Sequence, residues 1–441
     1  MRLRKTFSGR GECGRTDAFL KAAERIGAPF FPRGAFFAPE KGEIAPMKKL
    51  LSLLIAFAAL FALLSGCAPS DPAADVDFSA LACTQVEENA YAVRFRISHY
   101  EDESSRAYSR IEIFDAEGAG NSDWLLLPEG VEGVSGMPQG MVALTVRERS
   151  ALFVSSASAM SLFAAMDALD CVPLTTADTT WYIDEVKEAI AAGTLVEANR
   201  YDSPNYELIA AERTKSGMTL AVYSTMIDYK PEVESMLNSL GLYVLRDQSS
   251  AETHPLGRTE WCKVFGELTG RRAAADALFA GQKEVLERTL ASLPETEQKP
   301  KVLVFYSTTE GVYNVRNAED YVTKLVSLAG GVQPETVGEG KTGNTKMNEE
   351  AFRLLCEEAD FLLYNWTSGA AAGSEESVDA LISQGRVGAW IKNVPAYKSG
   401  NVWRTSDNFY QSMAAMGEMV ADVAAMLGGQ TEGLTYVSRL A

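Results

Sequence analysis

The stretch RRAAADALFAGQKEVLERTLASL, residues 271–293, decides the fold of this chain. It is rich in alanine, glutamate, leucine and lysine, and Gly281 is its weakest helix former. Pro294 and Pro300 follow and close it. Residues 257–293 as a whole predict two consecutive helices, of which the second is long.

Short apolar strands alternate with helical stretches on both sides of this long helix. Before it, we expect strands and helices at 151–154, 157–169, 171–174, 183–192, 206–212, 220–223 and 242–244. After it, we expect them at 302–306, 321–329, 349–356, 361–364 and 412–427. Apolar strands separated by helices indicate parallel sheets that are covered on both faces. The sequence therefore predicts an α/β protein of two Rossmann-like lobes with mostly parallel sheets, joined by one long helix.

The chain before Ala151 has a different pattern. Residues 93–97 and 109–114 alternate between apolar and polar side chains, as half-buried strands do. Residues 124–127 are apolar and run into a turn at 128–130. We predict a small antiparallel β appendage at the N-terminus of the first lobe.

A basic start at 47–49 and an apolar run from Leu50 precede Leu64-Ser65-Gly66-Cys67. This order is typical of a secretory signal peptide. The last four residues resemble the lipobox of bacterial lipoproteins, in which the cysteine receives a diacylglycerol and becomes the new N-terminus. A transmembrane helix is the alternative, but a span needs about 20 apolar residues and this run is shorter. The resemblance implies that Cys67 is lipidated and that the mature protein works outside the cytoplasmic membrane, anchored to it.

Residues 1–46 stand before this signal. The codons of Lys41-Gly42-Glu43 form a purine tract that can resemble a ribosome-binding site, so we expect Met47 to be the true start. The predicted organisation is an upstream extension, a signal peptide, a tether, a first lobe, a connecting helix and a second lobe, at residues 1–46, 47–66, 67–77, 78–270, 271–295 and 296–441.

The mature chain is strongly acidic. Loss of residues 1–46, with nine basic and five acidic side chains, and of Lys48 and Lys49 lowers the formal charge from −18 to −24. An acidic body of this kind repels nucleic acid, so we expect no nucleic-acid partner.

Histidine and cysteine usage excludes several classes of site. The two histidines, His99 and His254, cannot form a three-histidine zinc site, and no GxSxG elbow occurs. The cysteines after the lipobox show no CxxC spacing. We expect no metal site and no enzyme, and we leave open whether these cysteines form a disulfide or are small buried hydrophobic residues: Cys83, Cys171, Cys262 and Cys356.

Four stretches, taken in order, resemble the substrate-binding proteins of ABC importers, in the subtype that binds iron–siderophores, haem or cobalamin. Residues 252–261, ETHPLGRTEW, resemble the segment that opens the helical connector in a branch of that family. Residues 124–130, 311–316 and 350–365 resemble further elements of it. The resemblance runs from about Phe78 to the C-terminus. It implies a monomeric binding protein whose partners are an ABC permease and its ATPase.

In the family, one glutamate on the outer surface of each lobe pairs with arginines of the permease. Glu207 and Glu350 match these positions, and Glu349 is a neighbouring rival for Glu350. Exposed carboxylates can dock on guanidinium groups through charge-assisted hydrogen bonds. Without the resemblance, we would interpret both as ordinary glutamates near helix N-termini, where the helix macrodipole favours a negative charge.

The resemblance places the ligand between the lobes, at loops that follow the strands. Aromatic side chains suit a flat macrocycle or a catecholate, and an arginine suits an anionic chelate. For any one aromatic residue, packing in the core is the alternative. The resemblance implies a ferric siderophore, haem or cobalamin as ligand, with these candidate contacts: Ser155, Ser156, Tyr223, Ser224, Tyr306, Tyr313, Arg316, Trp366 and Tyr410.

Glu252 and His254 could ligate a metal or a haem iron, but we expect them to fix a turn before a helix that begins at Pro255. Arg258 is expected to pair with Glu252 for the same reason. His99 is expected on the surface of the appendage. Two other functions stay open: a sensory ligand-binding module and an extracellular enzyme.

Overall fold

The structure is a computed structural model that describes residues 74–146, 150–177, 180–309, 311–334, 337–365 and 375–440. The predictions on residues 1–46, on the signal peptide at 47–66 and on Cys67 lie outside the described residues. Residues 70–441 form one compact unit. Within the described ranges, no helix has both the length and the apolar character that a membrane span requires.

The N-terminal part of the described chain contains a five-stranded sheet of order β2-β3-β4-β5-β7. Its strands are β2 (Ala82–Val86), β3 (Phe95–Glu101), β4 (Ala107–Phe114), β5 (Gly120–Leu127) and β7 (Met141–Thr145). Strands β2 to β5 are antiparallel, as predicted. The sequence analysis did not predict β7, which runs parallel to β5. The chain first crosses back through β6 (Val131–Ser135), which pairs parallel with β1 (Ala74–Asp77).

The first lobe holds a parallel sheet of order β10-β9-β8-β13-β14. Its strands are β8 (Leu152–Val154), β9 (Leu174–Thr175), β10 (Val196–Glu197), β13 (Leu220–Ser224) and β14 (Tyr243–Asp247). Its helices are α2 (Met160–Ala165), α3 (Asp184–Ala192), α4 (Tyr206–Ser216) and α5 (Pro231–Ser239). The chain leaves β8 toward β9 on one side and adds β13 on the other. This reversal of strand order creates a crevice at the carboxyl ends of β8 and β13, where ligands bind in open α/β sheets.

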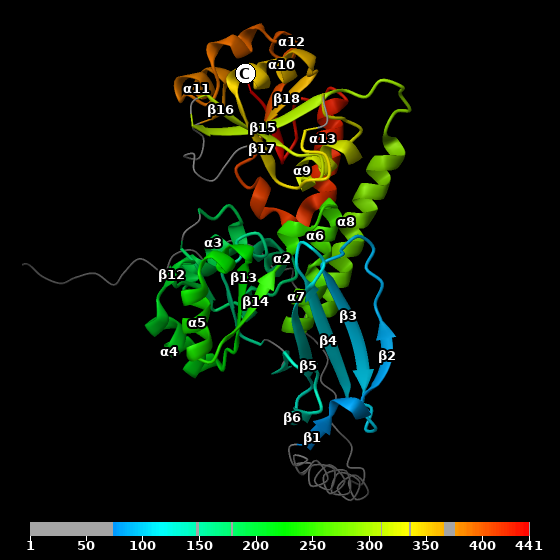
Figure 1. Ribbon diagram of the computed structural model, residues 1–441, viewed down its shortest axis with the longest axis vertical. Helices are drawn as coiled ribbons and strands as arrows, with labels where there is room; N and C mark the ends of the chain where they lie inside the picture. The colour runs from blue at the N-terminus through cyan, green and yellow to red at the C-terminus, as the bar shows by residue number, and fades with distance from the viewer. Residues whose placement is uncertain are drawn as a thin grey trace, which may run out of the picture. The chain divides into compact units, whose positions relative to one another are not determined.

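The connector contains three helices, where the sequence predicted two. They are α6 (Pro255–Glu260), α7 (Cys262–Thr269) and α8 (Arg272–Ser292). The chain bends at Trp261, and Gly270 ends α7 with a left-handed φ of 70°, which glycine adopts without strain. The long helix α8 agrees with the predicted connecting helix and runs toward the second lobe in Figure 1.

The second lobe holds a sheet of order β17-β16-β15-β18-β19-β20. Its strands are β15 (Val302–Thr309), β16 (Val312–Arg316), β17 (Asn344–Asn348), β18 (Phe361–Tyr364), β19 (Val402–Thr405) and β20 (Val437–Arg439). Strands β15, β18 and β19 are parallel, and the other three are antiparallel to their neighbours. Its helices are α9 (Tyr321–Leu328), α10 (Glu349–Glu358), α11 (Val378–Ser383), α12 (Pro395–Lys398) and α13 (Met416–Leu427).

Alternate residues of β15 face two different helical layers. Val302 and Val304 share a core with residues of α9 and α13, whereas Leu303 and Phe305 share another with residues of α10, α11 and α12. The first of these cores continues through the connector helices into the N-terminal sheet. The lobes are therefore joined by continuous apolar packing as well as by α8.

Two buried carboxylates fix the N-terminal sheet to the connector. Glu260 accepts hydrogen bonds from the backbone N–H groups of residues 90–92 at 2.8–2.9 Å and pairs with Lys263. Glu252 accepts from the N–H groups of Val93 and Arg94 at 2.9–3.1 Å. Hydrogen bonds from the five consecutive N–H groups of residues 90–94 therefore satisfy both charges.

No disulfide joins any two of the four described cysteines. Cys171, Cys262 and Cys356 are buried, and Cys83 is exposed. Burial raises the pKa of the Cys262 thiol to about 12. Of the two roles that the sequence left open, the three buried cysteines take that of small hydrophobic residues.

Candidate functional site

The candidate site lies where the carboxyl ends of β8, β13 and β14 in the first lobe and of β15, β18 and β19 in the second meet the junction of the lobes. On the first lobe, Ser155 follows β8 and Ser224 ends β13, and both side chains are half-buried. Ser156 is buried, and its hydroxyl donates to Asp247 Oδ2 at 2.7 Å. Ser155 and Ser224 can therefore face a ligand, whereas Ser156 is held by Asp247, which the sequence analysis missed.

Tyr223 corrects one prediction. It is 1% exposed, and its ring packs edge-on against Phe153 with centroids 5.6 Å apart, within the core beneath α4 and α5. Successive residues of a strand point to opposite faces, and Tyr223 takes the face that the helices cover. It is not available to a ligand in the cleft.

On the second lobe, the predicted ligand contacts Tyr306 and Arg316 lie side by side. The Arg316 guanidinium lies 5.2 Å from the centroid of the Tyr306 ring. Arg316 Nε donates to Asn365 Oδ1 at 3.0 Å, and Nη1 lies 3.4 Å from Asp320 Oδ2. The Tyr306 hydroxyl donates to Asn344 at 3.1 Å. This wall of the site combines an aromatic face with a partly exposed guanidinium.

Tyr313 corrects a second prediction. Its ring stacks on Phe352 of α10 with centroids 4.1 Å apart, and it is 1% exposed. Burial raises the pKa of Tyr313 to about 12, and Glu349 adds to the rise. Tyr313 and Arg316 are three positions apart on β16, so they face opposite sides of the sheet.

Asn314 is the residue of β16 that shares a face with Arg316. It lies opposite Tyr306 in the strand register, and its side-chain oxygen accepts a hydrogen bond from Asn344 Nδ2 at 3.0 Å. The sequence analysis missed Asn314, although the two-residue period of a strand marks it once Arg316 is assigned to the site.

Gln411 joins the lobes at the base of the site. Its buried side chain accepts from the N–H of Tyr182 at 2.9 Å and donates to the carbonyl of Thr180 at 2.7 Å. Burial raises the pKa of Tyr182, the neighbouring Tyr410 adds to the rise, and Arg404 opposes it. The predicted ligand contact Tyr410 therefore lies at the junction, beside an aromatic residue of the other lobe.

A hollow of about 360 Å³ opens at this junction. Residues of α2 and residues 182–185 line it from the first lobe, and Asn408, Gln411 and Tyr436 line it from the second. The remaining predicted contact, Trp366, lies outside the described residues.

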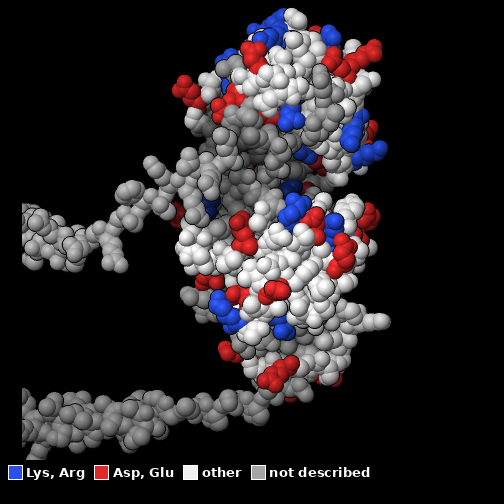
Figure 2. Space-filling model, turned by 90° about the vertical axis from the view of Figure 1, so that its left-hand side faces the viewer, with Lys and Arg blue, Asp and Glu red and all other residues white. Residues whose placement is uncertain are grey.

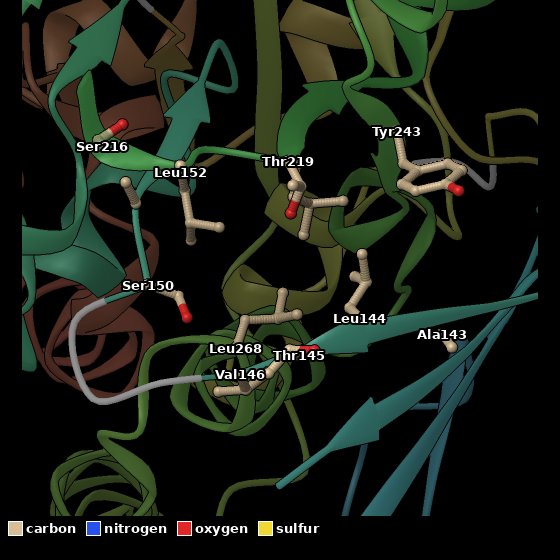
Figure 3. Close-up of a pocket in the computed structure, with 13 residues that line it drawn as sticks. Ala143, Leu144, Thr145, Val146, Ser150, Leu152, Ser216, Thr219, Tyr243 and Leu268 are labelled. Atoms are coloured by element: carbon tan, nitrogen blue, oxygen red, sulfur yellow. The ribbon is translucent and has the colours of Figure 1, made fainter. Parts of the chain in front are cut away.

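A larger hollow, of about 450 Å³, lies elsewhere (Figure 3). Its wall is formed by β7 and by the amino ends of β8, β13 and β14, with Leu152, Thr219 and Tyr243 facing it. Its described lining carries hydroxyl and aliphatic side chains and no charge. It lies at the end of the sheet opposite the crevice, so we do not place the ligand there.

The 252–261 segment is structural, as expected for Glu252 and His254. His254 Nδ1 accepts from the N–H of Leu256 at 3.1 Å and caps α6, while its ring stacks on Tyr91. Burial lowers the pKa of His254. The expected pair between Arg258 and Glu252 is wrong, because the Glu252 carboxylate is taken by backbone N–H groups and by Trp261 Nε1.

His99 is half-buried on the appendage, with 28% of its side chain exposed. It lies 2.6 Å from Glu87, and possible ligand atoms of Glu87, His99 and Glu267 lie within 4.8 Å of one another. Arg272 pairs with both glutamates, at 2.6 and 2.8 Å. A guanidinium thus already supplies the cation that this cluster needs.

The two predicted docking glutamates have matching surroundings. Glu207 is the second residue of α4, and Asn205 Oδ1 caps that helix by accepting from the N–H of Leu208 at 3.1 Å. Glu350 is the second residue of α10, and Asn348 caps it in the same way at 3.0 Å. Both glutamates are exposed.

Glu349, the rival of Glu350, differs from both docking candidates. It is half-buried, lies 4.0 Å from Arg353, and raises the pKa of Tyr313. The structure therefore favours Glu350 as the carboxylate that a partner can reach.

Comparison with solved structures defines the fold. The chain is similar to a periplasmic haem-binding protein from Pseudomonas aeruginosa, with a TM-score of 0.51, 14% identity, and coverage of 66% of this chain and 98% of that one. It is equally similar to a periplasmic binding protein from Veillonella parvula, with a TM-score of 0.51, 14% identity, and coverage of 64% and 92%. The predicted two-lobe α/β fold of the periplasmic binding proteins is thus confirmed.

Sequence comparison adds a relative of unknown activity. The chain is 24% identical over 251 residues to an uncharacterized lipoprotein of Methanocaldococcus jannaschii. The match covers 56% of each chain, so this chain spans a little over half the length of that relative. No family model matches the sequence.

Proposed function

We propose that this protein is the membrane-anchored substrate-binding component of an ABC importer. It captures an iron–siderophore or a related metal chelate between its lobes and delivers it to the permease. The observation that carries the proposal is the repeated arrangement of an exposed glutamate at the second position of an asparagine-capped helix, once in each lobe. Glu207 and Glu350 hold these positions.

This arrangement suits docking on a basic partner. Each carboxylate lies on a helix whose cap is already supplied by asparagine, so the glutamate is not needed to satisfy the helix N-terminus. Two such carboxylates on separate lobes fix the orientation of a partner that offers two guanidinium groups. The permease is that partner in this proposal, and an ATPase completes the importer.

The ligand proposal rests on Tyr306 and Arg316. A ring with a guanidinium 5.2 Å from its centroid suits an aromatic or macrocyclic chelate with anionic groups. Ser155, Ser224 and Tyr410 are further proposed contacts within the described residues, and Trp366, outside them, stays a prediction. Haem and cobalamin are the alternative ligands, and the P. aeruginosa structure is that of a haem-binding protein.

The location of the protein at the outer face of the cell membrane is part of the same proposal. The sequence before Cys67 resembles a lipoprotein signal, and the M. jannaschii relative is described as a lipoprotein. A lipid on Cys67 would hold the binding unit outside the cell membrane, next to the permease. We infer that it works there as a monomer and carries out no covalent chemistry, since the similar solved structures are binding proteins.

The surface charge fits a small-molecule receptor better than a nucleic-acid binder. Figure 2 shows acidic side chains spread over both lobes, next to basic ones. The formal charge of the whole chain is −18. Repulsion of phosphate backbones follows from this balance.

Uptake assays test the proposal. In proteoliposomes that carry the permease and ATPase, Glu207→Arg and Glu350→Arg each lower the uptake of radio-iron ferrichrome or haemin at least about tenfold, because like charges then meet at the docking face. The affinity of the purified protein for the same chelate stays unchanged. Glu357→Arg, on the exposed face at the other end of α10, is the control and leaves uptake unchanged. Equal uptake by all four proteins contradicts docking through these glutamates.

A further inference from the structure

Arg258 is a buried cation at the junction of the two lobes. It belongs to α6 and is 6% exposed. Its guanidinium lies 4.0 Å from the ring centroid of Tyr321, the first residue of α9 in the second lobe. The side chain therefore bridges the connector and the second lobe through a cation–π contact.

This guanidinium lacks a counter-charge. Its Nε has no hydrogen-bond partner, and none of the carboxylates in the described ranges forms an ion pair with it. The carboxylates on its own segment are already used, since Glu252 holds residues 93 and 94 and Glu260 holds residues 90–92. Proteins rarely bury a charge without a partner, because the lost hydration is not replaced.

A second guanidinium contacts the neighbouring residue. Asp320 caps α9 by accepting from the N–H of Val322 at 3.0 Å, and its other oxygen lies 3.4 Å from Arg316. Arg316 and Arg258 thus contact the consecutive residues Asp320 and Tyr321. Asp320 pairs with Arg316 alone, so Arg258 stays without a carboxylate partner among the described residues, and the positive end of the α9 dipole adds to the excess. This is a local surplus of positive charge in an acidic protein.

We propose that Arg258 is an anion-binding residue, which receives an oxyanionic group, a carboxylate or a phosphate, at the lobe junction together with Arg316. The inference rests on the proposed function in one respect: the oxyanion belongs to the captured chelate. The guanidinium lies over the ring of Tyr321, and its planar fork can bind an oxyanion through two parallel hydrogen bonds. Because Arg258 belongs to the connector and contacts Tyr321 of the second lobe, a ligand bound to Arg258 would lie at the junction of the lobes.

Arg258→Met separates this role from simple packing. Methionine keeps an unbranched apolar stem against Tyr321 and removes the charge. If Arg258 only packs, the variant melts at a lower temperature. If Arg258 is an anion-binding residue, it has no partner in the ligand-free protein. The ligand-free variant then melts at the same or a higher temperature than the native protein, because an unpaired buried charge has been removed.

The binding test uses probes that differ in charge. The purified protein is titrated with ferric citrate and haemin, which carry carboxylates, and with ferrichrome, an uncharged trihydroxamate. We expect Arg258→Met to weaken binding of the carboxylate chelates about tenfold or more and to change ferrichrome affinity less than about twofold. Arg258→Lys keeps the charge without the fork and restores part of the affinity. Arg353→Met is the matched control, because Arg353 also stacks on an aromatic ring, at 5.1 Å from Trp390, but is exposed.

Free citrate and inorganic phosphate, at ionic strength matched with sodium chloride, separate this inference from the proposed function. If these anions raise the melting temperature of the native protein but not of Arg258→Met, the anion site stands even when no chelate binds. If carboxylate chelates bind the native protein and Arg258→Met equally well, the inference is wrong and the proposed function stands. If neither free anions nor carboxylate chelates distinguish the two proteins, the inference is wrong.

Discussion

The 252–261 segment and the β15–β16 strand pair both concentrate charged and polar side chains, but they use them in opposite ways. In the first, Glu252 and Glu260 are buried, and backbone N–H groups satisfy their charges. In the second, Tyr306 and Arg316 are half-buried, and the guanidinium keeps part of its surface at the candidate site. A charge with a full set of internal partners builds the fold, whereas a charge with spare hydrogen-bond capacity is available to a ligand.

The comparison also explains why Arg258 differs from its neighbours. It lies between Glu252 and Glu260 in the sequence and is almost as buried. Its carboxylate neighbours are satisfied by the N-terminal sheet, and it faces Tyr321 instead. Position in a motif alone therefore does not reveal which of its charges is structural.

The largest effect is expected on the structural side of the comparison. Glu260→Ala leaves the N–H groups of residues 90–92 and the ammonium of Lys263 without their acceptor and lowers the free energy of unfolding by about 3–5 kcal/mol. Urea denaturation followed by circular dichroism measures it. Glu284→Ala, an exposed change on α8, is the control, with an effect within about 0.5 kcal/mol. A loss below about 1 kcal/mol for Glu260→Ala would show that the hydrogen bonds from residues 90–92 to Glu260 are not what holds the N-terminal sheet.

Substitution of Arg316 at the candidate site is expected to change stability less and ligand binding more. Arg316→Ala weakens the binding of ferric citrate or haemin about tenfold, because it removes a charge-assisted hydrogen bond. The free energy of unfolding falls by less than about 2 kcal/mol, since Asp320 keeps its capping role. Fluorescence titration and urea denaturation of one preparation give both values. The reverse result, lost stability with unchanged affinity, would place Arg316 among the structural charges.

The smallest effect concerns a carboxylate in a turn of the N-terminal sheet. Burial opposes ionisation of Asp102, but hydrogen bonds from Arg106, Tyr108 and Ser104 outweigh it and lower the pKa of Asp102 to about 2. A lowered pKa in the folded state stabilises the protein above the ordinary value of 3.8, and this stability is lost as the pH falls toward 2. The melting temperature of Asp102→Asn should therefore fall less between pH 5 and pH 2.5 than that of the native protein. If the melting temperatures of the two proteins fall equally with pH, Asp102 does not contribute to the pH dependence of stability.

The sequence predicted the layout because strand–helix alternation and a breaker-free helix are strong local signals. It missed the short helix break at Trp261 and the parallel strand β7, since both depend on contacts with distant segments. It also missed the role of Glu260. That residue becomes a structural anchor only because residues 90–92 pass over it in the folded chain.

The site was predicted less well than the fold, for a reason visible in β16. Aromatic character favoured Tyr313, but the alternation of strand faces places Tyr313 in the core beside Phe352 and Arg316 on the opposite face of the sheet. The same alternation places Tyr223 in the core. For both tyrosines, chemistry indicated a ligand contact and geometry overruled it.

The central claim is that this protein captures a metal chelate between its lobes. The most direct test is the tryptophan fluorescence of the purified protein, titrated separately with ferrichrome, haemin and cyanocobalamin. The account predicts saturable one-to-one quenching by at least one of them, with a Kd in the micromolar range or tighter, and a weaker response after Tyr306→Ala. The absence of saturable binding by all three chelates would contradict it.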